Sequence, residues 1–169
     1  MIKGAVIGPG LSGKSTLTQA LSRDYFARKG IRSLVLDPIA RSPSWGSHCW
    51  VSYNEAEFWP TVWKCRNCLV IVDDGSATIK RDRDLIPVFT TLRHLHHRLL
   101  VVAHDSSDFV PVMRRQFDTL YLFKQDQDAA DAWAKVFMND EIYQVTQLRQ
   151  YEFLRCRAWK PVQRLRLTM

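Results

Sequence analysis

The stretch Lys3-Gly-Ala-Val-Ile-Gly8-Pro-Gly-Leu-Ser-Gly-Lys-Ser15 decides the fold that this sequence predicts. Its first residues, Lys3 to Ile7, form a short apolar run typical of a buried strand. A helical spacing of apolar side chains then begins at about Lys14 and continues to Lys29. Between strand and helix, Gly8 to Ser15 matches the pattern G-x-x-x-x-G-K-[ST] without a mismatch. This order of strand, glycine-rich turn and helix predicts a phosphate-binding loop, or P-loop.

The P-loop predicts binding of ATP and Mg²⁺. Its glycines let the backbone curl, so that N–H groups and the positive end of the helix surround the phosphates. Lys14 is expected to reach the outer two phosphates, Ser15 to offer its hydroxyl to Mg²⁺, and Thr16 to contact the inner phosphate. The residues expected around the phosphates are Gly8, Gly10, Leu11, Ser12, Gly13, Lys14, Ser15 and Thr16. A glycine-rich turn that binds nothing is the alternative, and the strand and helix on either side argue against it.

The remaining chain alternates between strand-like and helix-like segments. Apolar runs predict strands at 33–37, 69–73, 99–103 and 119–123. Helical patterns cover 55–64, 87–96, 109–116 and 128–138, while 38–53 reads as a loop. A last strand is expected at 151–159, followed by a basic tail. Such alternation predicts an α/β fold with a mostly parallel, doubly wound sheet and right-handed crossovers.

Composition places the chain among single-domain proteins with a basic surface. Its 169 residues are 46% hydrophobic, which suits one compact domain over 1–169. The formal net charge of +7 favours nucleic acid or an acidic protein surface as a partner, and a merely solvated basic surface is the alternative. The excess is concentrated in the segment at about 149–169, in which Glu152 is the only acidic residue. Its basic residues are Arg149, Arg155, Arg157, Lys160, Arg164 and Arg166.

Two further features concern location and metal binding. The apolar run at the start is too short for a signal peptide, and no stretch reaches the roughly 18 apolar residues of a membrane span, so a cytoplasmic location is expected. Cys65-Arg-Asn-Cys68 has metal-ligand spacing. A zinc site needs two more ligands, and no second tight pair is present, so ordinary thiols are the preferred interpretation and metal binding stays open.

Polar residues at two strand ends predict the second half of a catalytic site. Asp73 follows a strand of branched aliphatics and is expected to hold the Mg²⁺ shell, while Asp74 activates or orients the attacking water. An ordinary aspartate pair at a strand end is the alternative. His104 ends the next strand, where it is a candidate sensor of the γ-phosphate or a merely hydrogen-bonded histidine.

Three arginines flank the strand at 99–103 and are candidates for stabilising transition-state charge, in cis or across a subunit boundary: Arg93, Arg114 and Arg115. The cluster His94, His96 and His97 follows Arg93. Because adjacent helical residues point in different directions, this cluster is interpreted as a polar surface rather than a metal site.

Taken together, these motifs resemble the FtsK/HerA superfamily of P-loop ATPases. The resemblance rests on the P-loop, Val-Asp73-Asp74, Leu92-Arg-His94, the polar strand end at His104 and the segment from Val110 to Phe123. It covers roughly residues 1 to 160, and within the superfamily it is greatest for small viral genome-packaging ATPases and Zot-like proteins. The family departs from this chain at two positions. It usually has Asp-Glu where Asp73-Asp74 stand, and glutamine where His104 stands.

The resemblance implies a three-layer P-loop NTPase fold with a central sheet in the order 5-1-4-3-2, here with an added C-terminal strand. It also implies rings that hydrolyse ATP at subunit boundaries and thread double-stranded DNA through the pore. A viral member would act in the host cytoplasm and at the capsid vertex. The basic C-terminal segment is a candidate either for contacting DNA or for docking on vertex proteins. The loop after Asp74 is a candidate to touch DNA phosphates through Lys80, Arg81 and Arg83, or a neutralised surface loop, since Asp82 and Asp84 interleave.

Three classes of function fit these residues. The first is an oligomeric ATPase that moves double-stranded DNA, most simply into a viral capsid. The second is a small-molecule kinase, because Asp37 ends the second predicted strand and Arg114 and Arg115 follow downstream. The third is a Zot-like assembly factor that binds ATP and hydrolyses it slowly. A GTPase is disfavoured, since no Asp-x-x-Gly follows the third predicted strand and Phe123-Lys-Gln-Asp126 lacks the asparagine of the guanine-reading motif.

Overall fold

A single mixed sheet organises the part of the chain that the computed structural model describes, residues 2–39, 45–73 and 86–168. Its strands run in the spatial order β3-β2-β4-β5-β1-β6-β7-β8. The strands from β3 to β6 in this order are parallel, and β7 and β8 are antiparallel additions at one edge. The bounds are β1 Lys3–Ile7, β2 Ser33–Leu36, β3 Cys49–Ser52, β4 Leu69–Val72, β5 Arg98–Ala103, β6 Thr119–Phe123, β7 Glu152–Arg157 and β8 Gln163–Arg166.

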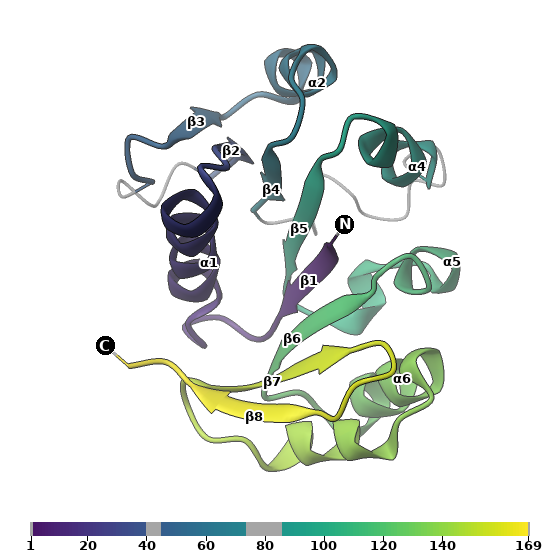
Figure 1. The fold of residues 1–169 in the computed structure, drawn as a ribbon. Coiled ribbons are helices and arrows are strands. Elements are labelled where there is room, and N and C mark those ends of the chain that lie inside the picture. The colour runs from purple at the N-terminus through teal and green to yellow at the C-terminus, as the bar shows by residue number, and fades with distance from the viewer. Residues whose placement is uncertain (1, 40–44, 74–85, 169) are drawn as a thin grey trace.

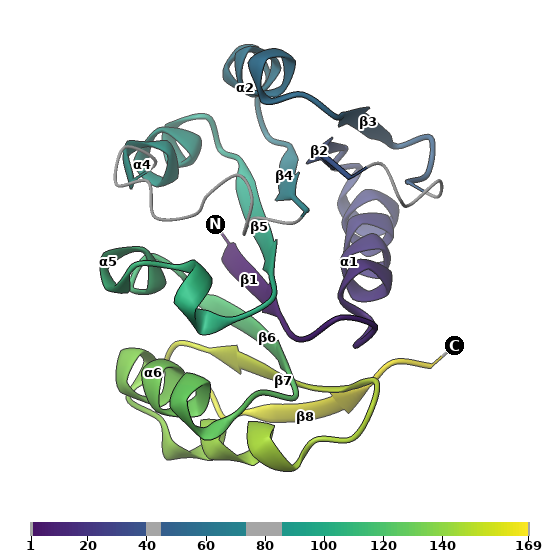
Figure 2. The same ribbon diagram turned by 180° about the vertical axis from the view of Figure 1, so that it is seen from behind.

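Helices cover both faces of this sheet, as Figures 1 and 2 show from opposite sides. Helix α1 (Lys14–Lys29) packs on one face, where Leu17 joins a core of alternate strand residues. The opposite face is covered by α2 (Glu55–Lys64), α4 (Ile86–His94), α5 (Pro111–Arg114) and α6 (Gln127–Phe137), together with the 3₁₀ helices η2 (Ser106–Asp108) and η3 (Asp140–Gln147). The predicted three-layer P-loop NTPase fold is therefore confirmed.

The predicted strand order is also confirmed. The five predicted parallel strands are β1, β2, β4, β5 and β6 in chain order, and in space they lie as β6-β1-β5-β4-β2, which is 5-1-4-3-2. Central strands such as β1 and β4 are buried on both faces. Continuous apolar runs identify such strands because neither face meets water.

Two edge strands contradict the predicted elements. The segment 38–53, expected to be a loop, ends in β3, whose Cys49 to Ser52 pair in parallel with β2. The expected basic tail contains β8, all four residues of which are exposed. Edge strands need no apolar alternation when only their backbone is paired, so hydrophobic periodicity gives no signal for them.

The helix expected over 109–116 is also shorter than predicted. It is the single turn α5, which begins at Pro111 after the 3₁₀ turn η2. A proline is favoured in the first helical turn because it has no N–H to leave unpaired, and its ring excludes an earlier helical start. None of the helices in the described ranges is long and apolar enough to cross a membrane.

Candidate functional site

The P-loop connects β1 to α1 at the carboxyl end of the central strand. Gly8 N–H donates to the carbonyl of Ala103, at 3.3 Å, which ties the start of the loop to the end of β5. The Lys14 ammonium donates to the carbonyl oxygens of Gly8, at 2.7 Å, and Pro9, at 2.8 Å. These bonds fold the lysine side chain back over the curled loop. The charge is thus held beside the backbone that the motif predicts to surround phosphates.

Two glycines of the loop have no room for a side chain. Gly13, which caps α1, has a φ of 104°, and a Cβ there would lie 2.6 Å from Leu167 Cδ1 and 3.3 Å from Tyr151 Cδ1. A Cβ on Gly8 would lie 2.6 Å from the Cβ of Phe123. Real Cβ atoms do not approach other atoms this closely, and a positive φ disfavours any other residue. The loop is therefore packed tightly against β6 and the C-terminal segment.

The carboxyl ends of the parallel strands meet at one cleft of about 410 Å³. In open α/β sheets, ligands bind at this edge, outside the carboxyl ends of the strands. Its lining combines loop residues with the residues that follow β2, β4 and β5: Gly10, Leu11, Lys14, Ser15, Asp37, Ile39, Asp73, Val102, Ala103 and His104. The structure thus brings together Lys14, Ser15, Asp73 and His104 at one cleft. Asp74 lies outside the described residues.

Asp37, which in sequence indicates only the kinase alternative, also lines this cleft. Its side chain is 5% exposed and accepts a hydrogen bond from Trp45 Nε1 at 3.3 Å. Its backbone N–H donates to Ser52 in β3, at 3.0 Å. Asp73 lies on the neighbouring strand end, and its N–H donates to Leu36 at 2.8 Å. The sequence signal for this placement is that Asp37 directly follows the second predicted strand, which is β2. Neighbouring parallel strands such as β2 and β4 end at the same edge of a sheet, where ligands bind.

The cleft offers the oxygen donors that Mg²⁺ prefers. Carboxylates and hydroxyls are hard ligands, and magnesium sites in nucleotide-binding proteins combine one or two carboxylates with phosphate oxygens. Ser15, Asp37 and Asp73 provide such donors around one space, with Lys14 beside them. The residue types therefore fit the predicted metal.

His104 lies at the exposed rim of this cleft, at the end of β5. Its backbone N–H donates to Asp108 Oδ2 at 3.0 Å, and the N–H of Asp105 donates to the same oxygen at 3.1 Å. Asp105 and Asp108 form a capping box on the 3₁₀ turn η2. These bonds fix the backbone of His104 at the rim of the cleft.

The three candidate arginines do not line the cleft of their own chain. Arg93 lies in a groove at the opposite end of the sheet. Arg114 donates from Nε to the carbonyl of Phe109 at 3.1 Å, and with Arg115 it lines a separate cavity beside α6. A role in cis is therefore not indicated for any of them, and a role across a subunit boundary stays a prediction. The DNA-contact candidates Lys80, Arg81 and Arg83 lie outside the described residues.

A second cavity, of about 230 Å³, lies on the other side of the P-loop. Gly10 and Leu11 line both cavities, and Leu11 stands between them with 92% of its side chain exposed. The remaining wall of the second cavity comes from the loop, the end of β6 and the turn before β7: Pro9, Ser12, Phe123, Lys124, Arg149, Gln150, Tyr151 and Glu152.

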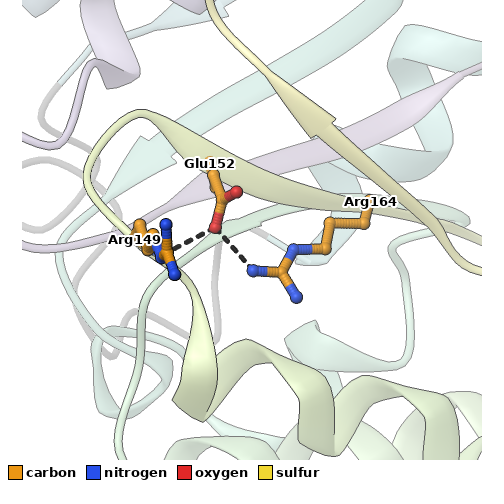
Figure 3. A network of polar contacts seen from close by, with 3 residues as sticks. All are labelled: Arg149, Glu152 and Arg164. Atoms are coloured by element: carbon orange, nitrogen blue, oxygen red, sulfur yellow. Dashed lines mark hydrogen bonds and ion pairs between the residues drawn. The ribbon is translucent and has the colours of Figure 1, made fainter.

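Polar contacts hold the turn that lines this second cavity (Figure 3). Glu152 Oε2 accepts from the backbone N–H of Arg149 at 2.8 Å and from Arg164 Nη2 at 2.7 Å. These two donors, the backbone N–H first, lower the pKa of Glu152 below its ordinary value. The carboxylate is therefore charged at neutral pH and connects the turn to β8.

The Cys65–Cys68 pair lies between α2 and β4, with both thiols partly buried. Burial and the neighbouring Cys65 thiol raise the pKa of Cys68 to about 11. Within 2–39, 45–73 and 86–168, no three side chains of His, Cys, Asp or Glu gather as metal ligands.

The fold and the strand-end cleft define the class of structure, that of the P-loop NTPases. In sequence, the chain matches no family model and no curated protein. Among solved structures, it is similar to the genome-packaging NTPase B204 of Sulfolobus turreted icosahedral virus 2 in complex with AMPPCP. That match has a TM-score of 0.82 and 17% identity, and it covers 99% of this chain and 98% of that one.

Two other solved structures extend the comparison. One is the cytoplasmic domain of the type VII secretion ATPase EccC of Thermomonospora curvata, with a TM-score of 0.66, 14% identity and coverage of 97% of this chain and 25% of that one. The other is the N-terminal domain of zonular occludens toxin from Neisseria meningitidis, with a TM-score of 0.53, 12% identity and coverage of 100% and 95%. The three matches, which are 17%, 14% and 12% identical, show that the chain shares the fold of these proteins.

Proposed function

We propose that this protein is an ATPase that translocates double-stranded DNA, as a viral genome-packaging motor. The observation that carries the proposal is the cleft in which Lys14, Ser15, Asp73 and His104 meet. Phosphoryl transfer needs positioned positive charge, a metal held by a strand-end carboxylate and a polar group near the γ-phosphate, and these residue types supply them. The similarity to a packaging NTPase along nearly the whole chain supports the same proposal.

The two cavities beside the P-loop suggest how ATP lies. The triphosphate would follow the loop, with Ser15 and Asp73 holding Mg²⁺, which would supply charge neutralisation at the phosphates when bound. The base would enter the second cavity, where Pro9, Leu11 and Tyr151 offer apolar surface and Lys124 a polar edge. Small-ligand sites combine apolar walls with few polar groups in this way.

Residues of the chain have distinct roles in the proposed hydrolysis. Lys14 stabilises charge that develops on the phosphate oxygens, and Asp74 orients the attacking water. His104 contacts the γ-phosphate as a sensor. Because none of Arg93, Arg114 and Arg115 lines the cleft, the proposed arginine contribution comes from a neighbouring subunit of a ring.

The further partners of the motor follow from the same proposal. Lys80, Arg81 and Arg83 are the proposed contacts to DNA in the ring pore, and the basic segment at 149–169 docks on capsid vertex proteins. The protein would work in the host cytoplasm and at the capsid vertex.

ATP hydrolysis measured with and without double-stranded DNA, at low and at moderate salt, tests the motor. DNA is expected to raise the rate at low salt, and moderate salt is expected to remove the stimulation because phosphate contacts release counterions. The Lys14→Ala variant gives the background rate. An ATPase rate that DNA leaves unchanged at low salt would contradict the motor. If the protein binds ATP firmly but hydrolyses it slowly, and DNA leaves that rate unchanged, a Zot-like assembly factor would be favoured.

The buried carboxylate of Asp37 favours one second candidate, a small-molecule kinase, because a carboxylate after β2 can accept a proton from an acceptor hydroxyl. The Asp37→Asn variant separates the two. In the motor, Asp37 supports the metal site, so the Mg²⁺ concentration for half-maximal hydrolysis is expected to rise about 10- to 100-fold while the maximal rate persists.

The kinase gives a different pattern. Wild-type turnover would then depend on a nucleoside or sugar acceptor, and Asp37→Asn would abolish transfer at every Mg²⁺ concentration. Asp108→Asn is not a suitable control, because it breaks the capping box. Asp131→Asn, on α6 and outside the cleft, removes an equal charge and is expected to leave the Mg²⁺ dependence unchanged.

A further inference from the structure

A groove of about 1000 Å³ lies at the end of the sheet opposite the P-loop. It is formed where the amino ends of β4 and β5 meet the end of α4 (Figure 1). The described residues that line it are Asn67, Arg93, His94, His96 and Arg98. The nucleotide cleft lies beyond the carboxyl ends of the same strands, so the two sites are separated by the length of the sheet.

Each of the five lining residues that the structure describes carries side-chain N–H groups, and none of these five is acidic or apolar. Arginine presents a planar fork of five donors that matches phosphate, and histidine and asparagine add single donors. Positive charge continues beyond the groove, because Lys29 Nζ and the Arg98 guanidinium lie over the Tyr25 ring, at 5.8 and 5.9 Å from its centroid. The groove is therefore an anion-binding surface by its chemistry.

Hydrogen bonds fix the side of the groove that carries Asn67 and Arg98. The N–H of Asn67 donates to Leu95 at 3.0 Å, and Arg98 Nη1 donates to the Asn67 side chain at 2.9 Å. His97, which is fully buried, accepts from the N–H of Cys68 through Nδ1, at 3.0 Å, and its Nε2 lies 3.0 Å from the carbonyl of Val62. Burial lowers the pKa of His97, so its ring stays neutral. The ring connects the turn at Cys68 to Val62 in α2. Donors fixed in advance lose little freedom on binding.

We infer that this groove binds phosphates of the double-stranded DNA backbone. The inference rests on the proposed function. It adds a second DNA-contacting surface to the one proposed for the loop after Asp74. Contacts to phosphate come from Arg, Asn and other N–H donors and carry no sequence information. An acidic protein partner would be expected to meet an apolar centre as well, since the centres of protein interfaces are apolar. The five described lining residues are all polar, and the Tyr25 ring lies against Arg98 outside this lining.

The test is a titration of a labelled duplex, followed by fluorescence anisotropy, in the absence of nucleotide. Any action of Arg93 on a neighbour's ATP is then excluded from the measurement. The variants are Arg93→Gln with His94→Gln, both exposed in the last turn of α4, and Arg98→Gln at the start of β5. Lys135→Gln, in the last turn of α6, is the matched loss of one exposed charge elsewhere. Circular dichroism confirms that each variant is folded.

Loss of one phosphate contact is expected to reduce the slope of log affinity against log salt by about 0.9 and to weaken binding several-fold at about 0.1 M salt. Arg93→Gln with His94→Gln should show this loss, while Lys135→Gln should bind as the wild type does. An unchanged affinity and an unchanged salt slope in the Arg93→Gln, His94→Gln variant (the α4 variant) would overturn the inference that this groove binds DNA. If DNA nevertheless stimulates ATP hydrolysis by the wild type, the motor stands and only the assignment of the groove is wrong.

Two other results would overturn the inference for different reasons. If the wild type does not bind the duplex at low salt, both the proposed motor function and DNA binding by the groove are contradicted. Polyglutamate that displaces DNA at equal charge concentration, and whose own binding is lost in the α4 variant, would assign the groove to an acidic protein instead of DNA.

Discussion

The Lys14→Ala variant is expected to hydrolyse ATP on the order of 10²- to 10³-fold more slowly than the wild type, because it loses a positioned cation where charge develops. The fold should persist, since the described bonds of the Lys14 ammonium are to Gly8 and Pro9 of its own loop. Steady-state hydrolysis and thermal melting measure the two effects.

Two comparison variants sharpen this prediction. Lys14→Arg keeps the charge but replaces a compact ammonium by a planar guanidinium, so it should be nearly as slow. Lys135→Ala, outside the cleft, should hydrolyse at the wild-type rate. A Lys14→Ala protein that retains most of its activity would show that the loop does not act on phosphates during turnover.

The Gly13→Ala variant is expected to lose stability and nucleotide binding together. A non-glycine residue in a strained backbone region costs about 1–3 kcal/mol, and at φ 104° alanine also brings its Cβ to 2.6 Å from Leu167. For a domain of this size, 2 kcal/mol corresponds to a fall in Tm of about 4–8 °C. Thermal melting and nucleotide titration measure the effects.

Gly10→Ala is the matched control, because a Cβ there meets nothing within 4 Å. It should melt close to the wild type. The double variant Gly13→Ala with Leu167→Ala separates strain from collision: removing the leucine relieves the contact but leaves the positive φ. Full recovery of Tm in the double variant would contradict backbone strain as a cause.

The sequence predicted the core of this fold because its signals are strong there. Helix α1 has the predicted bounds, since Gly13 and Gly30 cap it at both ends with positive φ. Strands β1 and β4 are buried on both faces and therefore read as continuous apolar runs. Edge strands β3 and β8 have no such pattern, because pairing with β2 and β7 determines them instead.

The candidate site was predicted in part for a related reason. Lys14, Ser15, Asp73 and His104 follow motifs along the chain, and the sheet order brings them together. Asp37 belongs to no phosphate-binding or metal-binding motif, so it was not assigned to the motor, although the expected strand order already places β2 next to β4. The second cavity was beyond prediction because its walls join residues from three separate segments, 9–12, 123–124 and 149–152.

The contact of Gly13 with Leu167 has a consequence for the order of events during synthesis. The P-loop is translated first, but its packing needs Phe123, Tyr151 and Leu167, and β1 pairs with β5 and β6. Contacts of such sequence separation form late, because a long chain must close before they are gained. On the ribosome, the nucleotide site therefore cannot be completed until nearly the whole chain has emerged, and a stalled or truncated product would carry an intact motif without a working loop.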